Sequence, residues 1–150
     1  MKIEVFPITN HGHQASSEKG QSFIEVGLSL IILITLLLGT VDASLMVLSL
    51  MALTDASEEG AMYGAINPTD TAGIVTRVRT HSSFPIDLSD TTNVAVQITI
   101  SGEACSGHTI TVDVTYNHPI ITPFMGGLIG SQIIPLSASA TNVIFRPECP

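Results

Sequence analysis

A long apolar run dominates the first part of the sequence. It extends from Phe23 to Leu53, and its only charged residues are Glu25 and Asp42. About 20 apolar residues in a helix cross the core of a bilayer. The run is therefore long enough to span a membrane and continue beyond it, and it is too long for an ordinary secretory signal peptide.

We predict that this helix extends past the membrane surface. Good helix formers continue to Ile66, and Asn67-Pro68 is a strong helix stop. The predicted helix runs from about Ser22 to Ile66 and is roughly 65 Å long. Its inner half, at about 23–45, spans the membrane, and its outer half is amphipathic.

The pattern after residue 67 predicts a short helix at 71–80 and three strands in which apolar and polar residues alternate. Each strand has one apolar and one polar face, which is typical of an antiparallel sheet with one side in solvent. The outer half of the long helix is the sizeable element that can cover the apolar side. The apolar faces are Val94, Val96, Ile98 and Ile100, then Ile110, Val112, Val114 and Tyr116, and finally Ile134, Leu136, Ala138 and Ala140.

The predicted fold class is therefore α+β, with a long N-terminal membrane-spanning helix at 21–66 that continues into a small domain at 67–150. That domain contains a three-stranded antiparallel sheet.

The third strand changes phase near Asn142, because Val143 and Phe145 have the opposite parity to the apolar residues before them. A β-bulge is the simplest explanation.

The outer half of the helix carries a stripe of small residues four positions apart, which places them on one face. The stripe consists of Ala52, Ala56, Gly60 and Gly64. Glycine inside a helix costs about 0.5–1 kcal/mol relative to alanine, so the two glycines indicate close approach of another backbone. One interpretation is a GxxxG face that pairs with another helix. We prefer close packing of the sheet, with Ala138 and Ala140 meeting the two glycines, because the stripe lies beyond the span.

The connection at 117–130 is long and strongly apolar, which is unusual for a solvated loop. Its large apolar residues are Ile120, Ile121, Phe124, Met125, Leu128 and Ile129. Such a segment either packs on the core of its own domain, which we prefer, or offers an apolar patch to a neighbour.

Charged residues are sparse and mostly acidic. They make up 12% of the chain, and the net charge is −8. This balance argues against a nucleic-acid partner, because phosphate contacts need a cationic surface.

After Lys19 the next cation is Arg77. The weak positive-inside bias therefore predicts the N-terminus in the cytoplasm and the C-terminal domain outside.

Cys105 and Cys149 are the only cysteines. An outward-facing domain lies in an oxidising compartment, where two cysteines are enough for one disulfide. Such a bond would pin the C-terminal tail and close a loop of about 45 residues, which is worth roughly 4 kcal/mol by the chain-entropy relation. The alternative is a pair of unpaired thiols.

No residue pattern predicts catalysis, a cofactor or a metal site. The sequence has no CxxC, no HExxH and no dense cluster of His, Asp and Glu. Cys105, His108 and Asp113 are near one another in sequence. However, Asp113 is assigned to the solvated face of its strand, and no oxyanion-hole motif accompanies these residues. We therefore predict a non-enzymatic protein with no cofactor.

The start of the apolar run resembles a processing signal. A charged leader ends in Lys19-Gly20, and Gln-Ser-Phe-Ile-Glu25 follows. With Asp42 closing the aliphatic run and Glu59-Gly60-Ala61 downstream, the segment resembles type IV prepilins. It resembles most fully the TadE-like family, the minor pseudopilins of tight-adherence (Tad/Flp) pili. The Val-x-Val-x-Tyr strand, the proline-containing apolar loop and the Ala-rich last strand are also similar to that family.

The resemblance implies cleavage by a prepilin peptidase after Gly20, with residues 1–20 as the leader and Gln21 as the mature N-terminus. Glu25 would be an assembly contact that pairs with the N-terminal amine of an adjacent subunit. The implied protein is a single-pass protein of the bacterial inner membrane that takes part in assembling a Tad-type pilus or related secretion fibre. Its implied partners are the peptidase, other pilin-like subunits, the pilus assembly platform and membrane lipid.

Two other classes of protein stay open on the sequence alone. The first is an unprocessed bitopic membrane protein whose outer domain binds a partner, and retention of the leader would favour it. The second is an outer-face thiol hydrolase, which would need catalytic spacing that the sequence lacks. Loss of an activity on Cys105→Ser would be the sign of that enzyme.

Overall fold

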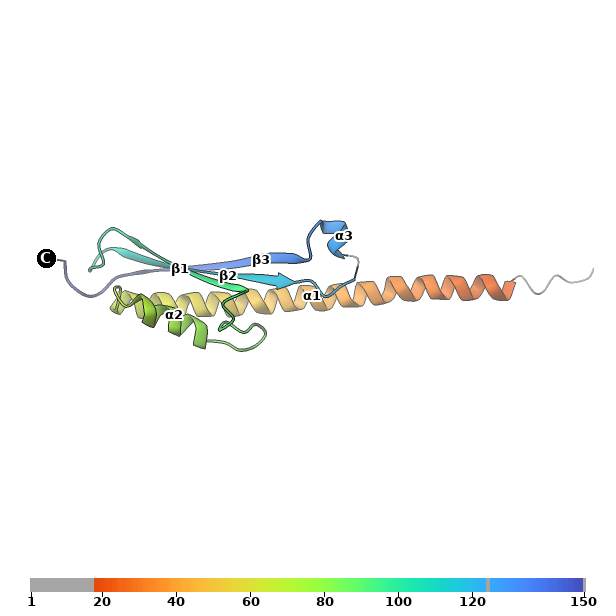
Figure 1. Cartoon of the computed structure of the whole chain (residues 1–150), viewed down its shortest axis with the longest axis horizontal. Coiled ribbons are helices and arrows are strands. Elements are labelled where there is room, and N and C mark those ends of the chain that lie inside the picture. Colours follow the sequence, from red (N-terminus) through yellow and green to blue (C-terminus); the bar gives the residue numbers. More distant parts are fainter. Residues whose placement is uncertain (1–17, 124, 150) are drawn as a thin grey trace, which may run out of the picture. The chain divides into compact units, whose positions relative to one another are not determined.

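The computed structural model describes residues 18–123 and 125–149, so most of the predicted leader lies outside the described residues (Figure 1). The chain divides into two compact units, Met1–Leu36 and Leu37–Pro150. The helix α1 (Glu18–Ile66) contributes to both units. In the first unit, the described part consists of the opening turns of α1.

The structure confirms the predicted long apolar helix and the site at which it ends. Within α1, the segment Gly20–Ile66 is long and apolar enough to cross a membrane. The described part of α1 starts at Glu18, so the helix already includes the turn before the predicted start at Ser22. It ends at Ile66, and the Asn67 amide donates to the Tyr63 carbonyl over 3.0 Å. The following Pro68 cannot continue the helix because its ring blocks the next turn.

The second unit confirms the α+β prediction. Its sheet contains β1 (Val94–Ser101), β2 (Thr109–Pro119) and β3 (Ile133–Val143), which pair antiparallel in the order β1-β2-β3. The helix α2 occupies Thr71–Thr80, as the sequence predicts, and a short helix α3 occupies Met125–Ile129. Consecutive strands are neighbours in the sheet, so the strands form a simple meander.

One face of the sheet forms the core together with α1 and α2. In Figure 1 the sheet runs along the yellow part of α1, and α2 lies beside the same part. Residues 37–66 of α1 therefore belong to the same compact unit as the sheet. The large apolar side chains that are fully buried are Leu53, Ile74, Val78, Leu88, Val94, Ile110, Val112, Val114 and Ile144.

The predicted β-bulge near Asn142 is wrong. β2 and β3 keep one register from Thr109 opposite Val143 to Pro119 opposite Ile133, with no extra residue in β3. Val143 lies on the outer face and is 47% exposed, whereas Ile144 returns to the core. One exposed valine costs little, so the change in the apolar pattern reflects a polar residue facing inward rather than a break in pairing.

Candidate functional site

The predicted processing and assembly residues lie at the start of α1. Gly20, Gln21 and Glu25 are all exposed. A side chain added at Gly20 would meet no atom within 4 Å. Among the described residues the one ion pair joins Arg77 to Glu59, so the Glu25 carboxylate has no cationic partner there.

The peptide bond between Gly20 and Gln21 lies within α1, near the start of its described part at Glu18.

Asp42 differs from Glu25 because its carboxylate is buried and fully engaged. It is only 4% exposed. Its Oδ1 accepts from the Ile121 amide over 3.2 Å, and its Oδ2 accepts from the Thr122 amide over 2.8 Å and from the Thr122 hydroxyl. Carboxylates that accept backbone N–H bonds are stabilised without a cation. Asp42 therefore fastens the apolar connection to α1.

β2 continues to Pro119, so the first three residues of the connection predicted at 117–130 belong to a strand, and the remainder is divided between the core and the surface. His118 and Thr122 are buried, and Ile120 and Met125 border a small apolar cavity beside Asp42. This inner part fits the prediction that the segment packs on its own domain. Ile121 is 61% exposed, however, so the segment also presents apolar surface.

The stripe of small residues faces the protein's own core. A Cβ at Gly60 would lie 2.6 Å from Val78 Cγ2 and 3.3 Å from Val112 Cγ1, and a Cβ at Gly64 would lie 2.7 Å from Ile110 Cδ1. The closest neighbours thus come from β2 and α2. The expected contacts of the two glycines with Ala138 and Ala140 of β3 are not among them. The other members of the stripe, Ala52 and Ala56, are buried as well.

A model of the TadE-like protein family matches residues 20–62. The match begins at Gly20, includes Glu25 and Asp42, and ends within the small-residue stripe. This segment is TadE-like. The matched segment includes most of the part of α1 that is long and apolar enough to cross a membrane. No curated protein and no solved structure matches the chain.

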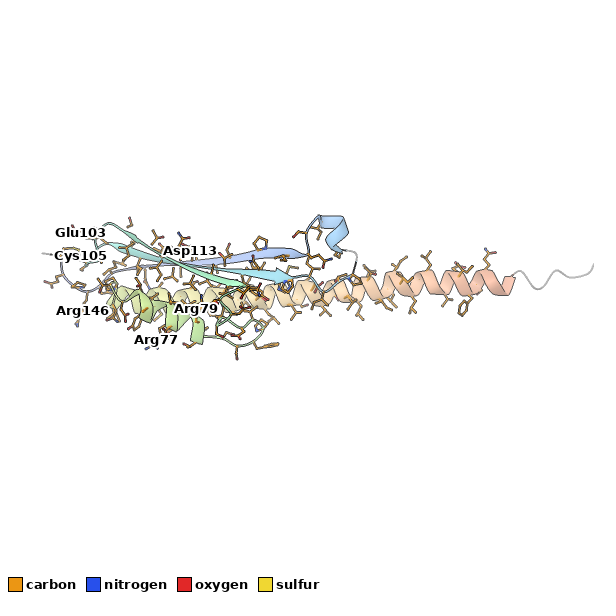
Figure 2. The ribbon with its side chains drawn as sticks, viewed as in Figure 1. Arg77, Arg79, Glu103, Cys105, Asp113 and Arg146 are labelled. Atoms are coloured by element: carbon orange, nitrogen blue, oxygen red, sulfur yellow. A yellow bond between two sulfur atoms is a disulfide. The ribbon has the colours of Figure 1, made fainter. Side chains whose placement is uncertain are left out.

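The two cysteines lie outside the TadE-like segment and are joined to each other. The Cys105–Cys149 disulfide has a Cα–Cα distance of 5.1 Å. It ties the tail after β3 to the connection between β1 and β2, at the end of the sheet where Figure 2 labels Glu103 and Cys105. His108 also lies near the two sulfurs, with its ligand atom and theirs within 4.8 Å of one another. While the disulfide is intact, neither sulfur is a thiolate that can ligate a metal or attack a substrate.

The role of Asp42 as an anchor was not predicted from the sequence. Asp42 is noticeable there only as a charge in an apolar run, and its partners are about 80 residues away. A signal for this contact does exist, because Asp42 is the only charged residue from Val26 to Thr54 and needs donors other than a nearby cation. The apolar connection offers the Thr122 hydroxyl and its own free backbone amides.

Proposed function

We propose that the chain is a minor pilin or pseudopilin that takes part in assembling a Tad-type pilus or related secretion fibre. In this proposal a prepilin peptidase cleaves the bond between Gly20 and Gln21 before assembly. The observation that carries the proposal is the family match beginning at Gly20. The mature protein contributes binding surfaces and no chemistry.

Cleavage at this bond would change the charge at the start of the helix. It removes Lys19 and creates an α-ammonium group on Gln21. Gln21 and Glu25 are four residues apart and share one face of α1. A parallel neighbouring helix displaced by about one turn would therefore bring its own α-ammonium opposite this carboxylate. That ion pair would neutralise a charge that is costly inside a membrane.

The proposed orientation places the N-terminus in the cytoplasm and the second unit outside. The scarcity of cations after Lys19 supports it. The disulfide supports it as well, because such bonds persist in oxidising compartments. In this orientation, the proposed partners of the protein are other pilin-like subunits and the assembly platform.

Processing is tested by expressing the full chain with its cognate prepilin peptidase and sequencing the N-terminus. We expect a mature chain that starts at Gln21, and no cleavage in Gly20→Ala, because a Cβ at this position would obstruct the peptidase. Ser29→Ala, a change within the span, should be cleaved normally. A wild-type chain that keeps Met1 would contradict the proposal and favour an unprocessed bitopic membrane protein.

The assembly role of Glu25 is tested separately with Glu25→Gln, which keeps the shape of the side chain and removes its charge. We expect normal cleavage and a loss of at least tenfold in the amount of chain recovered in sheared fibres or crosslinked to other pilins, equivalent to about 1.4 kcal/mol. Ser29→Ala again serves as the control. Fibre incorporation equal to wild type would show that the carboxylate is not the assembly contact.

A further inference from the structure

The end of the second unit that carries α3 has no exposed ionic charge among its described residues. No Asp, Glu, Lys or Arg occurs from Val114 to Phe145. On α1, Asp42 is the only charged residue from Val26 to Thr54, and it is buried. The charged residues labelled in Figure 2 lie on α2, on the sheet and near Cys105, away from α3.

Three isoleucines are exposed at this end, and we call them the α3 patch. Ile121 is 61% exposed, Ile129 is 51% exposed and Ile133 is 49% exposed. Ile121 precedes α3, Ile129 is its last residue, and Ile133 is the first residue of β3. A cluster of exposed large apolar side chains on a surface without charges marks an interaction site.

Three backbone amides that precede α3 are paired within the protein. The Ile120 amide donates to the Gln132 carbonyl over 2.9 Å, and Asp42 accepts from the amides of Ile121 and Thr122. An irregular segment leaves bulk water at a smaller cost when its polar backbone groups are paired within the protein. The three hydrogen bonds provide this pairing for the segment between β2 and α3.

The Asp42 contact also fixes the level of the patch along α1. A bilayer core is about 30 Å thick, which corresponds to about 20 helical residues. A span that starts at Phe23 therefore leaves the hydrocarbon near Asp42. The amides of Ile121 and Thr122 bond to this residue, so the patch lies where the helix meets the headgroups.

We infer that the α3 patch inserts into the interfacial layer of the leaflet from which the second unit emerges. The occupant of the patch is phospholipid. Apolar side chains at such an interface bury themselves about 5–10 Å into the boundary between headgroups and acyl chains. The inference rests on membrane anchoring and does not require cleavage at Gly20.

The absence of tryptophan from the chain allows a direct test. Ile129→Trp and Ile121→Trp each place a single tryptophan in the patch. The full chain is reconstituted in phosphatidylcholine–phosphatidylglycerol vesicles at low protein-to-lipid ratio, with lipids brominated at either a shallow or a deep acyl position. We expect blue-shifted emission and at least twofold stronger quenching by the shallow bromolipid than by the deep one.

Two further single-tryptophan variants serve as controls. Leu33→Trp, in the middle of the span, should be quenched most by the deep bromolipid. Phe145→Trp should be quenched by aqueous iodide and by neither lipid. Phe145 is 65% exposed, and its amide donates to the Ala65 carbonyl at the C-terminal end of α1. Circular dichroism establishes that each variant keeps its fold.

The outcomes separate lipid from other occupants. If the patch tryptophans resemble Phe145→Trp while Leu33→Trp is quenched, the patch does not touch lipid and the inference is overturned, although anchoring stands. Shielding that develops only at high protein-to-lipid ratio would mean that a second copy covers the patch, and this also overturns the inference. If Leu33→Trp is not quenched, membrane anchoring itself fails and the inference fails with it.

Discussion

At the scale of single residues, three carboxylates are held in three different ways. Glu25 is exposed on α1, Asp42 is buried against backbone amides, and Asp70 caps α2. The Asp70 carboxylate accepts from the Gly73 amide over 2.9 Å and from the Tyr63 hydroxyl over 2.8 Å. The Asp70 contacts therefore couple the start of α2 to the end of α1.

The hydrogen bonds of Asp70 predict that the folded state loses stability at low pH. The Gly73 amide and then the Tyr63 hydroxyl hold the pKa of Asp70 below its usual value of 3.8. A lowered pKa in the folded state gives stability that is present above pH 3.8 and is lost as pH falls through the folded pKa. We expect Asp70→Asn, which keeps a good N-cap but does not titrate, to lose less stability than wild type upon acidification. Thermal unfolding of the full chain in detergent between pH 6 and about pH 3 measures this.

The Asp70→Asn variant should still keep part of the acid sensitivity of the wild type. Side-chain and backbone donors from Ser89 lower the pKa of Asp87, and donors from Asn93 and Thr92 lower the pKa of Asp90. Both carboxyls act in the same direction as Asp70. Identical pH profiles for Asp70→Asn and wild type would show that the cap does not contribute to acid unfolding.

At the scale of elements, close approach of α1 to β2 and α2 depends on the two glycines of the stripe. The end of α1 and the three-stranded meander could be predicted from the sequence, because a helix stop and an alternation of period 2 are local signals. The contact partners of Gly60 could not, because spacing identifies a close-packing face without identifying what covers it. The bulge prediction failed for a related reason: the apolar character of Val143 does not decide which way it points.

Gly60→Ala tests this packing. The added Cβ would lie 2.6 Å from Val78 Cγ2, which forces adjacent core side chains to move. Overpacking of this kind costs about 1–3 kcal/mol, and we expect a lower thermal midpoint in detergent. Gly39→Ala is the matched control, since a Cβ there meets no atom within 4 Å, and it should be neutral or slightly stabilising. Equal midpoints for the two variants would contradict the close contact.

At the scale of the whole molecule, the second unit is fastened at both of its ends. Near one end, Asp42 holds the connection between β2 and β3. Near the other, the disulfide holds the tail after β3, and the Phe145 amide donates to the Ala65 carbonyl over 2.8 Å. The sheet is thus secured to α1 by contacts at the two ends of β3 as well as by the core between them.

The disulfide predicts a redox dependence of global stability. Its cysteines are separated by 44 residues, and a loop of this size is worth about 4 kcal/mol in the chain-entropy relation. We expect a reductant to lower the free energy of unfolding of the full chain in detergent, and to have no effect on the Cys105→Ser/Cys149→Ser double variant. Non-reducing mass analysis is the check: two alkylatable thiols in the oxidised wild type would rule the bond out.

The contact between Asp42 and Thr122 has a consequence for the order of folding. Each strand of the meander pairs with its neighbour in sequence, and such local pairings close at small entropic cost. The Asp42–Thr122 contact spans 80 residues and needs the sheet as a frame. Contacts of long sequence separation form slowly, so we expect docking of the α3 connection to be a late kinetic step, detectable as delayed protection of the Ile121 and Thr122 amides from hydrogen exchange.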